Sequence, residues 1–263
     1  LRTYAETRWQ FDTNDTAAGY TNDSEFSLNF AYIELGGLRI GKDESYFTTF
    51  TDYAGGVIND DLAGGYGPFD TNLISYSYSN NGFSFGISLE EGEDSPGWGI
   101  DDYMPHVVAG VGYDSGVFQV RGVVGYDTRN DIGLVEQGGW AAKLRGDVKL
   151  GEQASLFAML MYGEDSSAYA TWADGYDETR TRIAGEETFS IIGGASFNAS
   201  EKLTLNAQVQ WVDGNVLSDD QWSVVANAAY EVVPGLTVTP EVAYVDDGDD
   251  GLFGGYLRFQ RSF

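Results

Sequence analysis

The sequence has no cysteine, a single histidine and 5 prolines, and it has no long uninterrupted run of apolar residues. Without cysteine, neither a disulfide framework nor a thiolate metal site can form. No apolar run approaches the roughly 18 residues that a membrane-spanning helix needs, which excludes a helical membrane protein. A transmembrane β-barrel is still allowed, because residues that face lipid and residues that face the lumen alternate along each of its strands.

Basic residues are also scarce: 14 lysines and arginines stand against 41 aspartates and glutamates, for a formal net charge of −27. This excess of acid argues against a nucleic-acid partner. The chain is rich in residues that form turns and strands, with 35 glycines, 17 tyrosines and 15 phenylalanines, and it is too aromatic to be disordered. Its first residues include neither an initiator methionine nor a signal peptide, so we expect a mature or trimmed chain.

Apolar and polar residues alternate with period two in about fourteen segments, most of them roughly eight to twelve residues long, the length of a tilted transmembrane strand. In the second segment, one face carries Phe26, Leu28, Phe30 and Tyr32. The pattern predicts an all-β protein, a transmembrane antiparallel β-barrel that forms a single domain over residues 1–263. The predicted strands are 1–11, 25–35, 38–41, 73–79, 83–90, 106–113, 117–126, 140–150, 154–162, 189–198, 203–212, 221–232, 236–245 and 252–263.

The connections between these segments alternate between short and long. Tight turns fall at residues 36, 80, 115, 151, 199 and 234, and every connection between them is longer or more polar. This pattern is typical of an outer-membrane barrel with short periplasmic turns and long external loops, and it places both ends of the chain at the periplasmic side. Polar strand faces carry side chains such as Lys143, Arg145 and Gln208, so we expect these faces to line water.

Residues 42–71 interrupt the alternation and follow neither a strand nor a helix period. Six carboxylates in this segment stand against one lysine, Lys42, and a cluster of aromatic residues lies between Tyr46 and Tyr53. Long connections without regular structure are usually functional in compact proteins. We therefore expect this segment to fold against the inside of the barrel and to narrow its pore.

Five blocks of sequence resemble the general porins of alphaproteobacterial outer membranes, of the rhizobial and brucella type. They are FAYIELGGLRIGKDESYFTTFTDYAGGVINDDL, DDYMPHVVAGVGY, WAAKLRGDVKL, YEVVPGLTVTPEVAY and GGYLRFQRSF, and together they span nearly the whole chain. The resemblance implies a trimeric, 16-stranded, water-filled channel whose third external loop folds inward as the constriction. Members of this family carry an N-terminal portion of about two further strands. Either fourteen strands close the barrel here or two are missing from this sequence.

The charges expected at the constriction form two groups. Acidic loop residues would lie opposite basic residues on the polar strand faces and would set a transverse electric field across the narrow part of the pore. The acidic group is Asp43, Glu44, Asp52, Asp60 and Asp61, and the basic group is Arg8, Arg39, Arg121, Lys143, Arg145 and Arg258. The alternative is that each of them is an ordinary solvated residue of the barrel.

Three other features are interpreted as structural. The sequence places no nucleophile and no orienting group beside His106, so we do not assign it a catalytic role. Residues 246–251 lack the spaced ligands of a calcium loop and are interpreted as a solvated loop tip. Arg180 and Arg182 are expected to be ion-paired locally. We expect no metal site, no cofactor and no enzyme activity.

The resulting interpretation is a passive porin of a Gram-negative outer membrane, through which small hydrophilic solutes and ions diffuse with weak cation selectivity. A sugar- or anion-selective channel is the alternative within this class, and an outer-membrane enzyme or adhesin lies outside it. We expect contact with lipid and lipopolysaccharide, and recognition of the C-terminal Phe263 by the assembly machinery. Small outward residues in the first strand, Thr3, Ala5 and Thr7, favour a homotrimer interface there.

Overall fold

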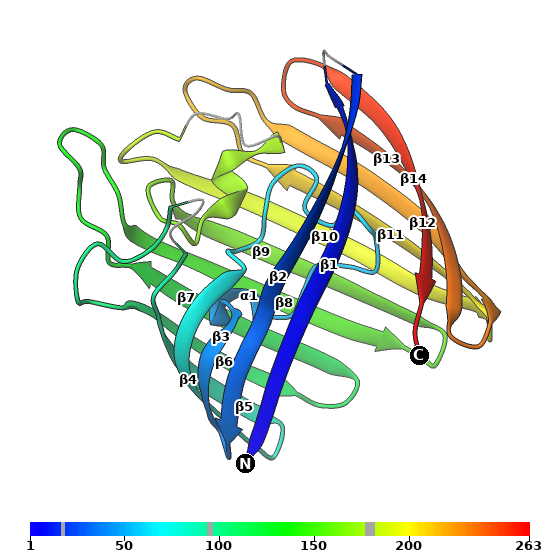
Figure 1. Ribbon diagram of the computed structural model, residues 1–263, viewed down its shortest axis with the longest axis horizontal. Helices are drawn as coiled ribbons and strands as arrows, with labels where there is room; N and C mark the ends of the chain where they lie inside the picture. Colours follow the sequence, from blue (N-terminus) through cyan, green and yellow to red (C-terminus); the bar gives the residue numbers. More distant parts are fainter. Residues whose placement is uncertain (17–18, 94–96, 177–181) are drawn as a thin grey trace.

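The structure, a computed structural model, describes residues 1–16, 19–93, 97–176 and 182–263. They form one antiparallel sheet of 14 strands in which each strand pairs with its neighbours in sequence, and the sheet curves around a central space (Figure 1). The strands are β1 (Arg2–Thr16), β2 (Gly19–Leu35), β3 (Leu38–Glu44), β4 (Asp70–Asn80), β5 (Phe83–Glu90), β6 (His106–Asp114), β7 (Phe118–Asp127), β8 (Gly139–Leu150), β9 (Ala154–Glu164), β10 (Glu187–Ser200), β11 (Leu203–Val212), β12 (Gln221–Val233), β13 (Leu236–Asp246) and β14 (Gly251–Arg261).

Two short helical segments of the described residues lie inside the curve of the sheet (Figure 1). These are α1 (Tyr46–Thr49), between β3 and β4, and the 3₁₀ turn η1 (Thr171–Asp174), between β9 and β10. No helix in the described residues is long and apolar enough to cross a membrane.

The tight turns lie at one end of the sheet and the long connections at the other. Gly36-Gly37, Asn81-Gly82 and Pro234-Gly235 join neighbouring strands at the first end, and both chain termini lie there too. This arrangement confirms the alternation predicted from the sequence. The polar connection predicted after residue 11 was wrong, because strands β1 and β2 continue through most of it, to Thr16 and from Gly19.

A β-bulge in β2 corrects the predicted face of its aromatic residues. Glu6 pairs with Phe30 and Thr7 pairs with Leu28, so Asn29 is an extra residue in β2. One extra residue reverses the side on which later side chains lie. Leu28 is therefore on the outer face, whereas Phe30 lies on the inner face, where its ring is 6.3 Å from that of Tyr4.

The outer face of the sheet is apolar and exposed. On β5, for example, the outward side chains Phe85 and Ile87 are 51% and 48% exposed, whereas the alternating inward residues Ser88 and Glu90 are fully buried. A surface of this kind is stable in lipid and unstable in water. The predicted alternation of lipid-facing and inward residues is confirmed for β5.

The largest hydrophobic core lies inside the curve, between the wall and two loops that fold inward. Inward wall residues such as Val108 and Met159 pack there with Phe47 of one loop and Trp172 of the other. We predicted that the polar inward faces line water, and beneath these loops this was wrong: Lys143 is 2% exposed. The loops exclude water from the upper part of the wall.

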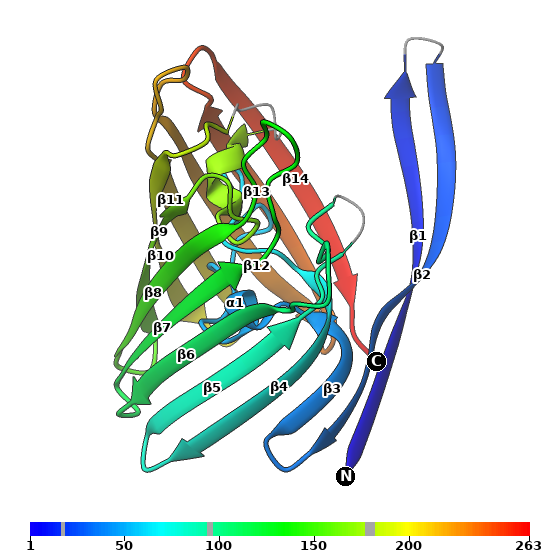
Figure 2. The ribbon, with the colours of Figure 1, turned by 90° about the vertical axis from the view of Figure 1, so that its left-hand side faces the viewer.

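The β1–β2 hairpin stands apart from the rest of the sheet over much of its length (Figure 2). Only residues Ala31–Leu35 of β2 pair with β3, because the chain leaves the wall at Glu44 to enter the inward loop. No pairing joins β1 to β14 in the described parts of the chain, and every residue of β14 is exposed. The two edges of the sheet are therefore open.

Candidate functional site

The constriction loop, residues 45–69, leaves the wall at the end of β3 and begins with α1. Ser45 caps this helix, because its hydroxyl accepts a hydrogen bond from the backbone N–H of Phe47 (3.2 Å). The ring of Phe50, directly after α1, packs against a glycine of the inner wall, because a Cβ added at Gly110 would overlap this ring. The loop can therefore lie flat on β5 and β6.

A fully buried carboxylate, that of Glu90 at the end of β5, fixes the root of the constriction loop. One of its oxygens accepts the backbone N–H of Tyr46 (2.7 Å), and the other accepts the hydroxyls of Ser45 (2.7 Å) and Tyr169 (3.0 Å). Sequence reasoning missed Glu90. The available signal was a charged residue at an inward position of a strand whose other inward residues are serine and glycine.

Lys143 of β8 holds the returning part of the constriction loop. Its ammonium group donates a hydrogen bond to the backbone carbonyl of Tyr66 (2.6 Å) and lies 4.8 Å from the ring centroid of Phe47. An ammonium group over an aromatic face is attracted by the negative side of the ring. These contacts stabilise a buried cation that has no carboxylate partner among the described residues.

Two arginines of the wall bind the loop in the same way. Arg121 of β7 donates to the backbone carbonyl of Phe50 (3.3 Å), and Arg145 of β8 donates to that of Tyr53. Arg145 also forms an ion pair with Asp147 (2.8 Å) on its own strand. The structure thus brings three of the predicted basic residues together beneath the loop, where they bind its carbonyl oxygens.

The far side of the constriction loop is bound to β11, β12 and β13, across the lumen from its root. Glu241 of β13 accepts the backbone N–H groups of Ile58 and Asn59. Three amide side chains donate to loop carbonyls: Gln208 to Asp60 (2.6 Å), Gln210 to Gly64 (2.6 Å) and Asn227 to Gly56 (3.0 Å). The loop therefore spans the lumen and is anchored at both sides.

A second inward loop, between β9 and β10, supports the constriction loop. The rings of Tyr169 and Phe47 are 5.2 Å apart, and the hydroxyl of Thr171 accepts the backbone N–H of Gly67 (2.8 Å). Trp172 is fully buried and donates through its indole N–H to a carbonyl of β10. Sequence reasoning predicted a long external loop at residues 163–188 and missed that it folds inward, although the loop shares two signals with residues 42–71, its length and its aromatic residues.

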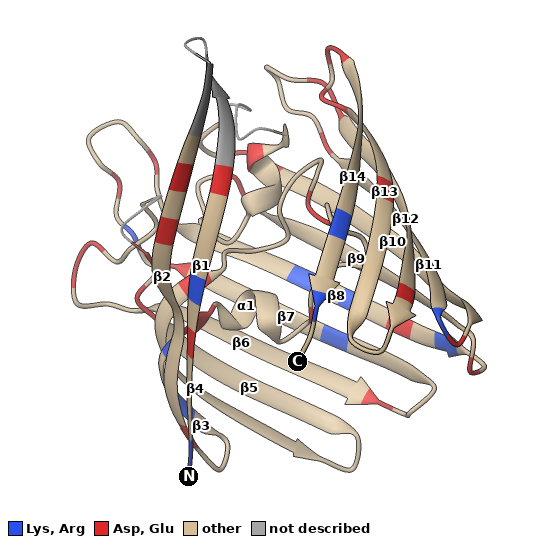
Figure 3. Ribbon diagram, turned by 45° about the vertical axis from the view of Figure 1, so that its right-hand side comes forward, with Lys and Arg blue, Asp and Glu red and all other residues tan. Residues whose placement is uncertain are grey.

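The other predicted basic residues lie away from this contact. Arg39 of β3 forms ion pairs with Glu34 (2.8 Å) and Asp43. Arg8 lies on β1, 4.0 Å from a carboxylate of the same strand, and Arg258 lies on β14. Both are therefore on strands at the open edges of the sheet (Figure 3).

The predicted acidic residues divide between exposed and partly buried positions. Asp52 and Asp61 are exposed, and Glu44 accepts the hydroxyl of Tyr53. Asp60 accepts the hydroxyl of Tyr66 (3.0 Å). Burial, together with the neighbouring charge of Asp61, raises the pKa of Asp60 to about 6.

The sequence is similar to known proteins over its whole length. The porin subfamily model matches residues 1–262. Porin Omp2b of Brucella neotomae is 41% identical over the whole chain, which covers 72% of that protein. The chain belongs to the porin family. Porin Omp2b of Brucella abortus strain 2308 is 39% identical with the same coverage.

Solved structures of outer-membrane channels have the same fold as this porin. The channel DcaP of Acinetobacter baumannii superimposes with a TM-score of 0.71 at 17% identity, over 98% of this chain and 81% of that one. The anion-selective porin from Comamonas acidovorans gives 0.61 at 16% identity, over 97% and 95%. As a member of the porin family, the chain is an outer-membrane channel protein rather than an enzyme, and its strands are arranged as in porin barrels, so its predicted class and location are confirmed.

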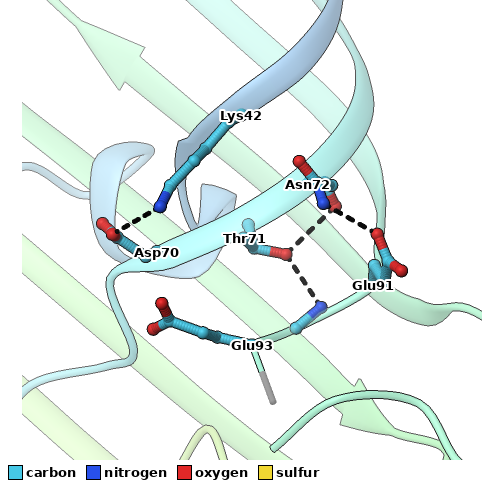
Figure 4. Close-up of a pocket in the computed structure, with 7 residues that line it drawn as sticks. Lys42, Asp70, Thr71, Asn72, Glu91 and Glu93 are labelled. Atoms are coloured by element: carbon cyan, nitrogen blue, oxygen red, sulfur yellow. Dashed lines mark hydrogen bonds and ion pairs between the residues drawn. The ribbon is translucent and has the colours of Figure 1, made fainter. Parts of the chain in front are cut away.

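A polar cleft of about 360 Å³ lies on the outer side of the porin wall, beside the root of the constriction loop (Figure 4). Lys42 and Asp70 form an ion pair across it (3.1 Å). The amide of Asn72 donates to Glu91 (2.9 Å), and the hydroxyl of Thr71 accepts the backbone N–H of Gly92 (2.9 Å). These bonds tie β4 to the start of the next external loop.

The features interpreted as structural have local partners in the porin. Nδ1 of His106 accepts the backbone N–H of Thr128 (3.0 Å), and Nε2 lies 2.9 Å from the carbonyl oxygen of Trp98, so both ring nitrogens bind backbone groups. Arg182 is ion-paired with Asp174, as predicted, and Arg180 lies outside the described residues. In the 246–251 loop, Asp247 accepts backbone N–H groups of the tip.

Proposed function

We propose that this porin is a general-diffusion channel in which residues 45–69 form the constriction and small hydrophilic solutes and ions pass beside them. The observation that carries the proposal is the anchoring of this loop on both sides of the lumen, through Glu90 at its root and Glu241 at its far side. A loop fixed in this way narrows the water-filled space permanently, and the narrowest cross-section limits flow.

Shortening the constriction loop tests this proposal. Replacing residues 55–64 with two glycines removes the part that is bound to β11–β13, and single-channel conductance should at least roughly double, because the narrowest section widens. The matched control shortens the exposed external tip at residues 131–136, where Leu134 is fully exposed. Its conductance should equal that of the wild type. Unchanged conductance in the loop variant would contradict the proposal.

We also infer that the channel is weakly cation-selective. The three wall cations beneath the loop donate to backbone carbonyls, whereas the exposed carboxylates of Asp52 and Asp61 remain on its surface. The formal net charge of −27 adds a negative field at the mouth. These charges support a preference for cations over anions.

A homotrimer is part of the same proposal. Thr3 and Ala5 of β1 lie on the outer face, opposite Ile33 and Ala31 of β2, and small or polar side chains suit a protein contact better than lipid tails. Native mass spectrometry in mild detergent should give three times the subunit mass. Substituting Thr3 and Ala5 with leucine should shift the population toward monomer, whereas a monomeric wild type would contradict this part.

A further inference from the structure

A cavity of about 410 Å³ opens on the inner wall of the porin, on the side of α1 that faces the tight turns. It is lined by inward residues of β3, β4, β5 and β7 and by α1 itself. Because it lies next to the constriction loop, a solute that passes the loop comes into contact with it. Its lining carries charges of both signs, and we call the side at Arg121 its positive end and the side at Glu44 its negative end.

Arg121 provides the positive end of the cavity. Its only hydrogen bond among the described residues is the one to the carbonyl of Phe50 (3.3 Å), and no described carboxylate lies within ion-pair distance of it. A guanidinium group has five N–H donors, so most of them are available to a ligand. Arg39, which also lines the cavity, differs because Glu34 and Asp43 occupy its donors.

Glu44 provides the negative end. Its carboxylate accepts the hydroxyl of Tyr53, and among the described residues it has no ion-pair partner. Asp43 lies beside it, on the same wall of the cavity. Ion pairs with two arginines offset the neighbouring carboxylates of Asp43 and Glu34. The uncompensated charge at this end is therefore that of Glu44, which attracts a cation.

Hydroxyl groups line the cavity between its two ends. Ser75 and Ser77 of β4 and Ser84 of β5 point inward, and the Ser77 hydroxyl is 2.7 Å from that of Tyr46. Hydroxyls both donate and accept hydrogen bonds, so this surface solvates polar groups of either kind.

We propose that this cavity is a binding subsite for small zwitterions, namely amino acids and short peptides, with the carboxylate on Arg121 and the ammonium group at Glu44. A simple anion would leave Glu44 uncompensated, a simple cation would leave Arg121 uncompensated, and a neutral polyol would pair with neither. The inference rests on the proposed channel function. Binding must stay weak enough for the solute to leave, so the subsite would favour passage of zwitterions.

Block of the ion current tests the subsite. L-serine and glycylglycine, added to wild-type channels in a planar bilayer, should reduce the KCl current saturably, whereas glycerol, lactate and ethanolamine at equal concentration should not. Arg121→Gln should raise the half-blocking concentration of both zwitterions by about fivefold or more, the loss expected for a charge-assisted hydrogen bond. Glu44→Gln, at the opposite end, should do the same and preserve the acceptor for Tyr53.

The matched control is Arg258→Gln, which removes one inward positive charge on β14, away from the cavity, and should leave the half-blocking concentration within about twofold of the wild type. Equal block in wild type and both cavity variants, or block by lactate alone, would overturn the subsite. A conducting channel without block by zwitterions would also overturn it and leave the porin function intact. A wild type without conductance would instead overturn the proposed channel function.

Discussion

Glu90 shows how one buried carboxylate can organise a channel. It accepts hydrogen bonds from Ser45 and Tyr46 of the constriction loop and from Tyr169 of the second inward loop. Two loops that are far apart in sequence thus share one acceptor on the wall. A buried donor that loses its acceptor keeps its full desolvation cost, so this position is sensitive to substitution.

Glu90→Ala should lower the free energy of unfolding by about 3 kcal/mol, since it leaves three buried donors without an acceptor. Glu90→Gln keeps an acceptor oxygen and should cost less. Urea-induced unfolding of the refolded porin in lipid measures both. Glu91→Ala is the control, because Glu91 points to the outer face and is exposed. A loss in Glu91→Ala equal to that in Glu90→Ala would argue against the shared acceptor.

Asp60 should make the stability of the constriction loop depend on pH. Its pKa in the folded protein is about 6, raised from the usual 3.8 chiefly by burial. The folded state therefore favours the protonated carboxyl, and this stabilisation is complete below about pH 4 and is lost as pH rises through about 6. Asp60→Asn, which is neutral at every pH, should melt at a higher temperature than wild type at pH 7.5 and at the same temperature at pH 4.

Asp247 gives a control of opposite sign. Backbone N–H groups of Asp250 and Asp249 lower the pKa of Asp247, so its charged form is the one that stabilises the fold. Asp247→Asn should therefore lower the melting temperature slightly at pH 7.5. If Asp60→Asn also lowered the melting temperature at pH 7.5, the charged carboxylate of Asp60 would not be destabilising.

At the scale of elements, glycines on the inner faces decide how closely the loops approach the wall. A Cβ added at Gly110 of β6 would overlap the ring of Phe50, whereas one at Gly122, on the outer face of β7, would lie 3.6 Å from Leu144, an ordinary contact. Gly110→Ala should displace α1, cost about 1–3 kcal/mol and change the single-channel conductance.

Gly122→Ala is the matched control for this substitution. It should be neutral or stabilise the porin by up to about 1 kcal/mol, because alanine loses less backbone entropy than glycine in a strand. Denaturant unfolding and bilayer recordings compare the two variants directly. Equal stability and equal conductance would show that the ring of Phe50 can move aside at no cost.

The sequence predicts the strands and turns well because period two persists wherever one face meets lipid. It does not predict the bulge at Asn29, since Phe26, Leu28, Phe30 and Tyr32 alternate perfectly along the chain. Only the partner strand, where Glu6 and Thr7 pair with Phe30 and Leu28, reveals the reversal. Local pattern alone cannot detect one extra residue.

The constriction loop is predictable from its composition, but its anchors are not. Gly55 binds Gln208, which lies 153 residues away in the sequence, and no short-range pattern links the two. The prediction placed Lys143 and Arg145 on the inner wall but gave them acidic partners in the loop. Their loop partners are backbone carbonyls, which every residue carries and which composition therefore cannot indicate.

At the scale of the whole molecule, salt should control selectivity. Lowering KCl lengthens the Debye length from about 3 Å at 1 M to about 30 Å at 0.01 M, so more distant acidic loops act on the permeation path. The ratio of potassium to chloride permeability should therefore exceed one and rise as salt falls. Reversal potentials across a salt gradient measure this ratio. Preference for chloride, or a ratio independent of salt, would mean that the basic wall governs permeation.

A double variant tests whether acidic residues at the mouth of the channel, rather than those at the constriction, cause this dependence on salt. Asp249→Asn with Asp250→Asn removes two charges from the exposed tip between β13 and β14. The permeability ratio should fall at low salt and stay unchanged at 1 M, since distant charges are screened there. A change at 1 M would place these carboxylates next to the path of the ions.

The loop anchored by Glu90 and Glu241 is, in mechanical terms, a beam clamped at both ends and propped near one of them by the second inward loop. A clamped beam deflects far less under load than a cantilever that is held at its root alone. The load in a membrane is the transmembrane voltage, which pulls on the charges of the loop. We expect a loop of this stiffness to give a pore that stays open under voltage and an ion current with little noise.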